Sequence, residues 1–181
     1  MNKNIKEIAV VLDGTAPQPL EIVLDKPGET VRVIVLGIGR NSDAFNAPMK
    51  IIHRAPHTTS ETTMKTVLMD GSIRQGDAVI VIEKGAAGSN ARLEARTLLL
   101  SPNARATTKP VFEILENDVR ASHAATTGAL NPDELFYLQS RGVDPADARQ
   151  MLTWGFIAAG LEKIQDTTVR AAAEKKLKAS L

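Results

Sequence analysis

The chain has 181 residues, of which 43% are apolar and 24% charged, with a formal net charge of +1, a composition typical of an ordinary globular domain. A charge balance so close to zero offers no general attraction to nucleic acid or to an anionic membrane, and 3% aromatic residues are too few for a base-stacking platform. Cysteine is absent, so the chain alone cannot form a disulfide, a zinc–thiolate site or a cysteine-ligated iron–sulfur site.

The apolar runs in the sequence are short. None has the length needed to span a bilayer. Charged residues interrupt the first residues, MNKNIKEIAVVLDG, so they lack the apolar core of a signal peptide. We therefore expect a cytoplasmic protein.

Short β-type runs follow one another from Ile5 to about residue 130. They are rich in Val, Ile, Leu and Thr, and Gly-containing turns separate them. The runs are Ile8–Leu12, Leu20–Leu24, Val31–Leu36, Met49–His53, Met64–Leu68, Ala78–Ile82, Ala91–Leu99 and Lys109–Ile114. Many short strands with frequent turns predict a sandwich, a barrel or a solenoid, and no strict repeat length distinguishes among them. The first strand has no evident cover, so we expect it to need a partner or a cap.

The residue pattern changes after Leu130. The segment Asn131-Pro132-Asp133-Glu134 is typical of a helix start, because Asn caps helices and Pro is favoured at the first position. Gly142 is expected to end this helix.

The segment Asp144-Pro145-Ala146-Asp147 predicts the start of a second helix by the same logic. A third helix is expected from about Leu161 to Lys178. The sequence therefore predicts a β-domain over residues 1–130 and a small helical domain over residues 131–181.

Two of the three histidines lie close together in the segment IIHRAPHTTSETT. Imidazole is a ligand for zinc, iron and copper. However, Pro56 separates His53 from His57, so they are not one helical turn apart, and no Asp or Cys flanks them. We therefore interpret this pair as structural, with hydrogen-bonded ring nitrogens.

The third histidine, His123, is followed by a run of small residues from Ala124 to Gly128. Small neighbours leave room for a ligand, a metal or a partner subunit. The alternative is a histidine packed at the β-to-helix junction and bonded to a backbone carbonyl. The residue pattern by itself leaves both interpretations open.

Residues 110–142, PVFEILENDVRASHAATTGALNPDELFYLQSRG, join this histidine segment to the first predicted helix. In this order they closely resemble the C-terminal core of the SufB/SufD family, the scaffold subunits of Suf-type iron–sulfur cluster assembly. The resemblance covers about residues 50–164. The pattern positions include Pro110, Glu113, Ile114, Asp118, Val119, Ser122, His123 and Thr126.

The resemblance implies a mainly β fold, a right-handed parallel β-helix (β-solenoid) followed by a small C-terminal α-helical domain. It implies that two subunits pair through their β-helix ends, this chain with itself or with a SufB-like subunit. It also implies that the helices dock a SufC-like ABC ATPase. The candidate docking residues are Phe136, Tyr137, Arg141, Leu152 and Phe156.

His123 matches a histidine of the cluster-assembly site proposed for SufD-type subunits, with Ser122 and Glu113 as candidate neighbours. SufD-type members often carry Cys-Ser-His-Gly where this chain has Ala121-Ser122-His123-Ala124. The chain is therefore expected to bind no cofactor stably alone. A transient iron–sulfur cluster or iron is expected at the subunit junction, with His123 as the metal ligand.

These expectations define a non-catalytic scaffold subunit, not an enzyme, in which ATP-driven closure of the ATPase dimer twists two β-helices and opens the junction at His123. The alternative is a β-solenoid interaction or regulatory protein that binds the ATPase but has lost cluster chemistry, as the missing cysteine and Ala124 would suggest. A third hypothesis, a small metal-dependent enzyme using the three histidines, lacks a carboxylate at ligand spacing.

Overall fold

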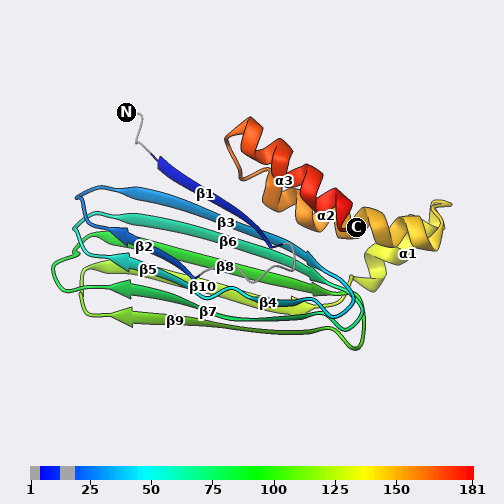
Figure 1. Cartoon of the computed structure of the whole chain (residues 1–181), viewed down its shortest axis with the longest axis horizontal. Coiled ribbons are helices and arrows are strands. Elements are labelled where there is room, and N and C mark those ends of the chain that lie inside the picture. Colours follow the sequence, from blue (N-terminus) through cyan, green and yellow to red (C-terminus); the bar gives the residue numbers. More distant parts are fainter. Residues whose placement is uncertain (1–4, 13–18) are drawn as a thin grey trace.

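The computed structural model describes residues 5–12 and 19–181, which form two parallel sheets and three helices (Figure 1). The first sheet, sheet A, contains in order β1 (Ile5–Leu12), β3 (Thr30–Gly39), β6 (Thr59–Leu68), β8 (Ser89–Leu99) and β10 (Val119–Gly128). The second, sheet B, contains β2 (Leu20–Leu24), β5 (Met49–His53), β7 (Ile73–Ile82) and β4 (Ala44–Asn46), with β9 (Arg105–Ile114) also paired to β7. The chain passes back and forth between the sheets, so the architecture is a β-solenoid.

One turn of the solenoid takes about thirty residues. Paired positions in β3 and β6 are 29 residues apart, as in Thr30 opposite Thr59, and those in β7 and β9 are 32 apart, as in Ile73 opposite Arg105. Between β1 and β3 the offset is only 25, with Ile5 opposite Thr30. Because the offset varies from turn to turn, the sequence shows no strict repeat.

The predicted solenoid and the eight predicted strand segments are confirmed, since each segment lies within an observed strand. Two strands differ from expectation. The three-residue strand β4 was not predicted because it is too short to show alternation. The small residues after His123 are not a junction with the helices, because β10 continues through them to Gly128.

The two sheets enclose an apolar interior. Alternate residues of each strand point into it, and their side chains form one cluster that runs through the turns and includes Val33, Ile51, Ile80 and Leu93, each at most 1% exposed. This interior cluster is the main core of the chain.

The C-terminal segment forms helices α1 (Pro132–Ser140), α2 (Pro145–Leu161) and α3 (Thr167–Ala179). Both predicted helix starts are confirmed, because Asn131 and Asp144 accept hydrogen bonds from the backbone N–H groups of residues 133 and 146. The predicted start of the third helix was wrong. Leu161 is the last residue of α2, and Asp166 caps α3 with its carboxylate.

Helices α2 and α3 pack on the outer face of sheet A. A second apolar cluster, which we call the tail cluster, joins Ile34, Leu36 and Ile38 of β3 to Ile157 of α2 and Leu177 of α3. The helix approaches the sheet closely at Gly160, where a Cβ atom would lie 2.5 Å from Leu36. An alanine here would therefore force the end of the Leu36 side chain to shift.

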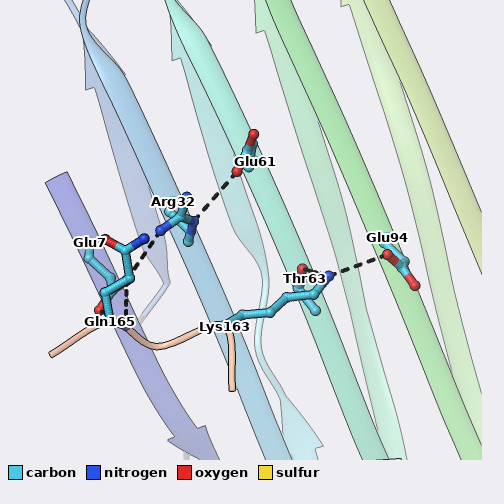
Figure 2. A network of polar contacts seen from close by, with 7 residues as sticks. All are labelled: Glu7, Arg32, Glu61, Thr63, Glu94, Lys163 and Gln165. Carbon is cyan, nitrogen blue, oxygen red and sulfur yellow. Dashed lines mark hydrogen bonds and ion pairs between the residues drawn. The ribbon is translucent and has the colours of Figure 1, made fainter. Parts of the chain in front are cut away.

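Polar groups also anchor the helices to sheet A, as Figure 2 shows. The carboxylate of Glu7 on β1 accepts hydrogen bonds from the backbone N–H groups of Gln165 and Asp166. Lys163 donates to the hydroxyl of Thr63 at 3.0 Å and lies 3.6 Å from a carboxylate oxygen of Glu94. The α2–α3 connection thus contacts the first strand, which was expected to need a partner or a cap, through Glu7.

A buried lysine strengthens the same contact. Lys65 of β6 donates to the carbonyl oxygen of Phe156 at 3.0 Å, and its Nζ lies 4.4 Å from the centre of the Phe156 ring. Burial lowers the pKa of Lys65. In the described part of the chain, no helix is long and apolar enough to cross a membrane.

Replacing Ile157 by alanine should lower the free energy of unfolding by about 3 kcal/mol, because this fully buried side chain fills the tail cluster. Urea denaturation followed by circular dichroism would measure the loss. Met151→Ala on the exposed face of the same helix is the matched control and should cost less than about 1 kcal/mol. Equal losses in the two variants would show that the tail cluster is not a true core.

Candidate functional site

The last turn of the solenoid is its exposed end. In the described chain β9 pairs only with β7, and β10 pairs only with β8. Most of β10 is exposed, and two apolar side chains at the end of β9 are in water, Ile114 at 43% and Leu115 at 68%. We call this turn, residues 105–128, the terminal rung. Its unpaired backbone edge and exposed apolar residues are typical of a surface that another chain covers.

His123 lies in the middle of β10 on the terminal rung and points toward the interior. It pairs with Leu93 of β8, a member of the interior cluster. Its ring meets the edge of Phe112 from β9, with ring centres 5.2 Å apart and an interplanar angle of 84°. Within the described residues the imidazole has no hydrogen-bond partner, so its ring is available to a metal or to a group of a partner chain.

The other two candidate residues of this site point away from His123. Ser122 precedes it on β10 and so faces the outer side of sheet A, next to Arg92. Glu113 follows Phe112 on β9, and because Phe112 packs on the interior cluster, Glu113 faces the outer side of sheet B. The terminal rung therefore brings the three residues to one end of the molecule but not into contact with one another. The side chain in contact with His123 is that of Phe112. Its residue type gave no reason to name it as a site candidate from the sequence.

His53 has a structural role in the interior. Its Nδ1 and Nε2 lie 2.8 Å from the hydroxyl oxygens of Thr58 and Ser60. The Thr58 hydroxyl donates to the carbonyl of Ala55, so Nδ1 carries the proton and donates to Thr58, while Nε2 accepts from Ser60. Burial lowers the pKa of His53 to about 4, so the ring is neutral at pH 7.

The histidines do not form a metal centre together. His57 is exposed in the turn after β5, with a positive φ of 59°, and His123 lies on the terminal rung. Over residues 5–12 and 19–181, no three His, Cys, Asp or Glu side chains are grouped so that they could hold a metal ion. The hypothesis of a small enzyme built on three histidines thus has no assembled site to support it.

The five candidate docking residues divide into two sets. Phe136, Tyr137 and Arg141 are exposed on and just after α1, with Phe136 72% exposed and the Arg141 guanidinium 5.3 Å from the Tyr137 ring centre. Leu152 and Phe156 are half-buried on α2 and line a groove beside the ends of β8 and β10. An exposed aromatic pair on a short helix is typical of a protein-binding surface.

The fold and the terminal rung define the class of protein: a parallel β-solenoid with an open end that presents the imidazole of His123, and a helical tail with an exposed aromatic surface. The SufBD core domain of the SUF system for FeS cluster assembly matches residues 6–156, and the chain belongs to this family.

Individual relatives agree with this assignment. The iron–sulfur cluster assembly protein SufD of Bacillus subtilis is 35% identical over 131 residues, which cover 72% of this chain and 29% of the relative. SufD of Escherichia coli is 28% identical over 87% of this chain and 36% of its own length, and SufB of Bacillus subtilis is 30% identical over 72% and 27%. The chain thus spans about a third of the length of these relatives, and its likeness to SufD is the stronger of the two.

His53 makes stability depend on pH. Its pKa is about 4 in the folded chain, against an ordinary value of 6.5 that applies once the chain unfolds, so the unfolded chain binds the proton more tightly between these values. Stability is therefore fully present above pH 6.5 and falls as the pH drops toward 4, by at most roughly 3 kcal/mol. His53→Gln should remove this part of the slope in urea denaturation curves between pH 7 and pH 4.

The exposed residue His57 provides the control for this experiment. His57→Gln should keep the slope of the unmodified chain. If His53→Gln keeps it as well, then His53 does not stay neutral in the folded state.

Proposed function

We propose that this chain is a scaffold subunit of Suf-type iron–sulfur cluster assembly that performs no bond chemistry of its own. The single observation that carries the proposal is the free, inward-pointing imidazole of His123 on the open terminal rung of a SufBD core. The cluster or its iron is then cargo that is held at a junction between subunits. Imidazole nitrogen is a suitable ligand for iron.

The terminal rung is the proposed pairing surface, where the chain meets a second copy of itself or a SufB-like subunit. Ile114 and Leu115 supply exposed apolar area, and the free edges of β9 and β10 supply backbone donors and acceptors. In such a pair His123 would be at the contact, with Ser122 and Glu113 at its margins. Because this chain has no cysteine, any thiolate ligand of the cluster must come from the partner.

The helical tail is the proposed docking site for a SufC-like ABC ATPase. Phe136 and Tyr137 lie exposed on α1, and Arg141 lies beside the Tyr137 ring; aromatic residues and Arg are the types that contribute most to binding at interfaces. Leu152 and Phe156, half-buried beside the ends of β8 and β10, complete the proposed docking set. Movement of the docked ATPase would reach the solenoid through the tail cluster and open the junction.

A second candidate function is a β-solenoid interaction or regulatory protein that binds the ATPase without assembling clusters. The observation that favours it is Ala124, which follows His123 on β10 and offers no ligand atom. This protein would bind the ATPase as tightly as the scaffold does, but the loss of His123 would have no effect on clusters.

Phe136→Asp should weaken binding to the SufC-like ATPase of the same organism at least about tenfold, because a charge would replace the most exposed aromatic ring of α1. Co-purification with light scattering would measure the complex and count its subunits. Val169→Asp, at another exposed apolar position on α3, is the control and should bind normally. If the unmodified, folded chain does not bind the ATPase, then its likeness to the family concerns the fold and not ATPase docking.

His123→Ala should lower the free energy of unfolding by no more than about 1 kcal/mol, because the side chain is exposed and loses only its edge contact with Phe112. ATPase binding should stay intact. Cluster formation in a reconstituted complex, followed by visible absorption, should drop roughly tenfold. His57→Ala, which removes an exposed histidine from a turn, should have no effect. Unchanged cluster formation in His123→Ala would favour the regulatory function.

A further inference from the structure

An arginine is buried inside the solenoid without a carboxylate. Arg74 on β7 is 0% exposed, and it points inward because it alternates in step with the interior residues Ala78 and Ile80. Its Nη1 donates to the hydroxyl oxygen of Thr108, and its Nη2 lies 3.8 Å from the sulfur of Met64. Nε has no partner, and no ion pair within the described residues includes this guanidinium.

Such an arrangement is costly for the fold. A guanidinium keeps its proton in proteins, so the positive charge must be compensated, and a buried charge is normally paired with an opposite charge or with several acceptors. The described part of the chain supplies Arg74 with one hydroxyl and one thioether.

A cavity of about 280 Å³ lies at the terminal rung, and one of its lining residues, Thr108, accepts the hydrogen bond from Arg74. Its inward-facing lining comes from the last three strands that the structure describes and contains only small side chains and hydroxyls: Ala95, Thr97, Ala106, Thr108, Ala125 and Thr127. None of the described residues that line it is acidic. The cavity has room for several water molecules or for one small ion.

Threonine hydroxyls supply the hydrogen-bonding groups of this cavity. Arg74 occupies an acceptor position of the Thr108 hydroxyl, so the hydroxyl proton of Thr108 points elsewhere. On the opposite wall, in-register pairing stacks Thr66, Thr97 and Thr127 on successive strands of sheet A. The Thr66 hydroxyl is buried and has no partner among the described residues.

We propose that this cavity binds a small oxyanion of the size of sulfate or phosphate. The threonine hydroxyls donate to its oxygens, and the Arg74 guanidinium below Thr108 supplies the compensating positive charge. Guanidinium and hydroxyl groups together, without a carboxylate, form a donor set that selects anions. The polar groove between sheet A and the α2–α3 connection is unsuitable because Glu61 and Glu94 line it beside Arg32 and Arg92.

Equilibrium dialysis of the purified chain against radiolabelled sulfate, at constant ionic strength in a chloride buffer, tests the proposal directly. The expected result is saturable binding of one ion per chain, with unlabelled phosphate as a competitor. Arg74→Met, which keeps an unbranched stem but removes the charged guanidinium, should weaken binding at least about tenfold. Arg32→Met changes an arginine in the mixed-charge groove and should bind like the unmodified chain.

A second variant provides an independent test in case Arg74→Met does not fold. Thr97→Val keeps the shape of the side chain and removes one donor from the cavity wall, so it should weaken sulfate binding while the circular dichroism spectrum stays unchanged. The proposal is overturned if the unmodified chain shows no saturable binding, or if folded Thr97→Val and Arg74→Met both bind normally. Neither result depends on the ATPase or on pairing, so the proposed scaffold function would be unaffected.

The natural occupant of the cavity is either a dissolved oxyanion or a carboxylate from a paired subunit. In both cases the isolated chain binds sulfate. Dialysis of the paired complex distinguishes them: sulfate stays bound if the occupant is a dissolved oxyanion, and is displaced on pairing if the occupant is a carboxylate of the partner.

Discussion

In-register parallel pairing is the constraint on which the rest of this structure depends. Each residue has as its nearest neighbour the residue one turn earlier, so side chains form continuous columns across the sheets. One column of sheet A runs from Val33 through Thr62 and Leu93 to His123. Its first members are buried because another strand lies on each side. His123 occupies the same inward position on the terminal rung, where the column ends. Because no further strand covers it in the described chain, its imidazole is exposed although the position is equivalent to a core position.

The two ends of the solenoid differ in their contacts with the helical tail. At the first strand, the carboxylate of Glu7 is occupied by backbone N–H groups of the α2–α3 connection, and the tail cluster covers the adjacent outer face. At the terminal rung, apolar residues are left in water. Because Lys65 and Lys163 attach the tail to sheet A, a force applied to the helices is transmitted to the solenoid rather than lost in a flexible linker.

The sequence predicted most strands, because alternation and turn residues are local signals, and it predicted two helix starts from capping residues. The strand patterns did not distinguish a solenoid from a sandwich, because the residues within a strand do not indicate which distant strand it pairs with, as Thr30 pairs with Thr59. At the candidate site, the small residues after His123 lie exposed on β10. The contact of Phe112 with His123 and the isolation of Arg74 depend on residues that lie on different strands. A local signal for Arg74 did exist, since it shares its alternation with Ala78, Ile80 and Ile82 in IRQGDAVIVI.

The winding of the chain between two sheets limits how such a sequence can change in length. Adding or removing a complete turn of about thirty residues returns each later strand to its own sheet, whereas half a turn would transfer β10 from sheet A to sheet B. His123 would then point into the interior from the opposite sheet. Viable length variants of this fold should therefore differ by a whole number of turns, although a single turn can vary by several residues.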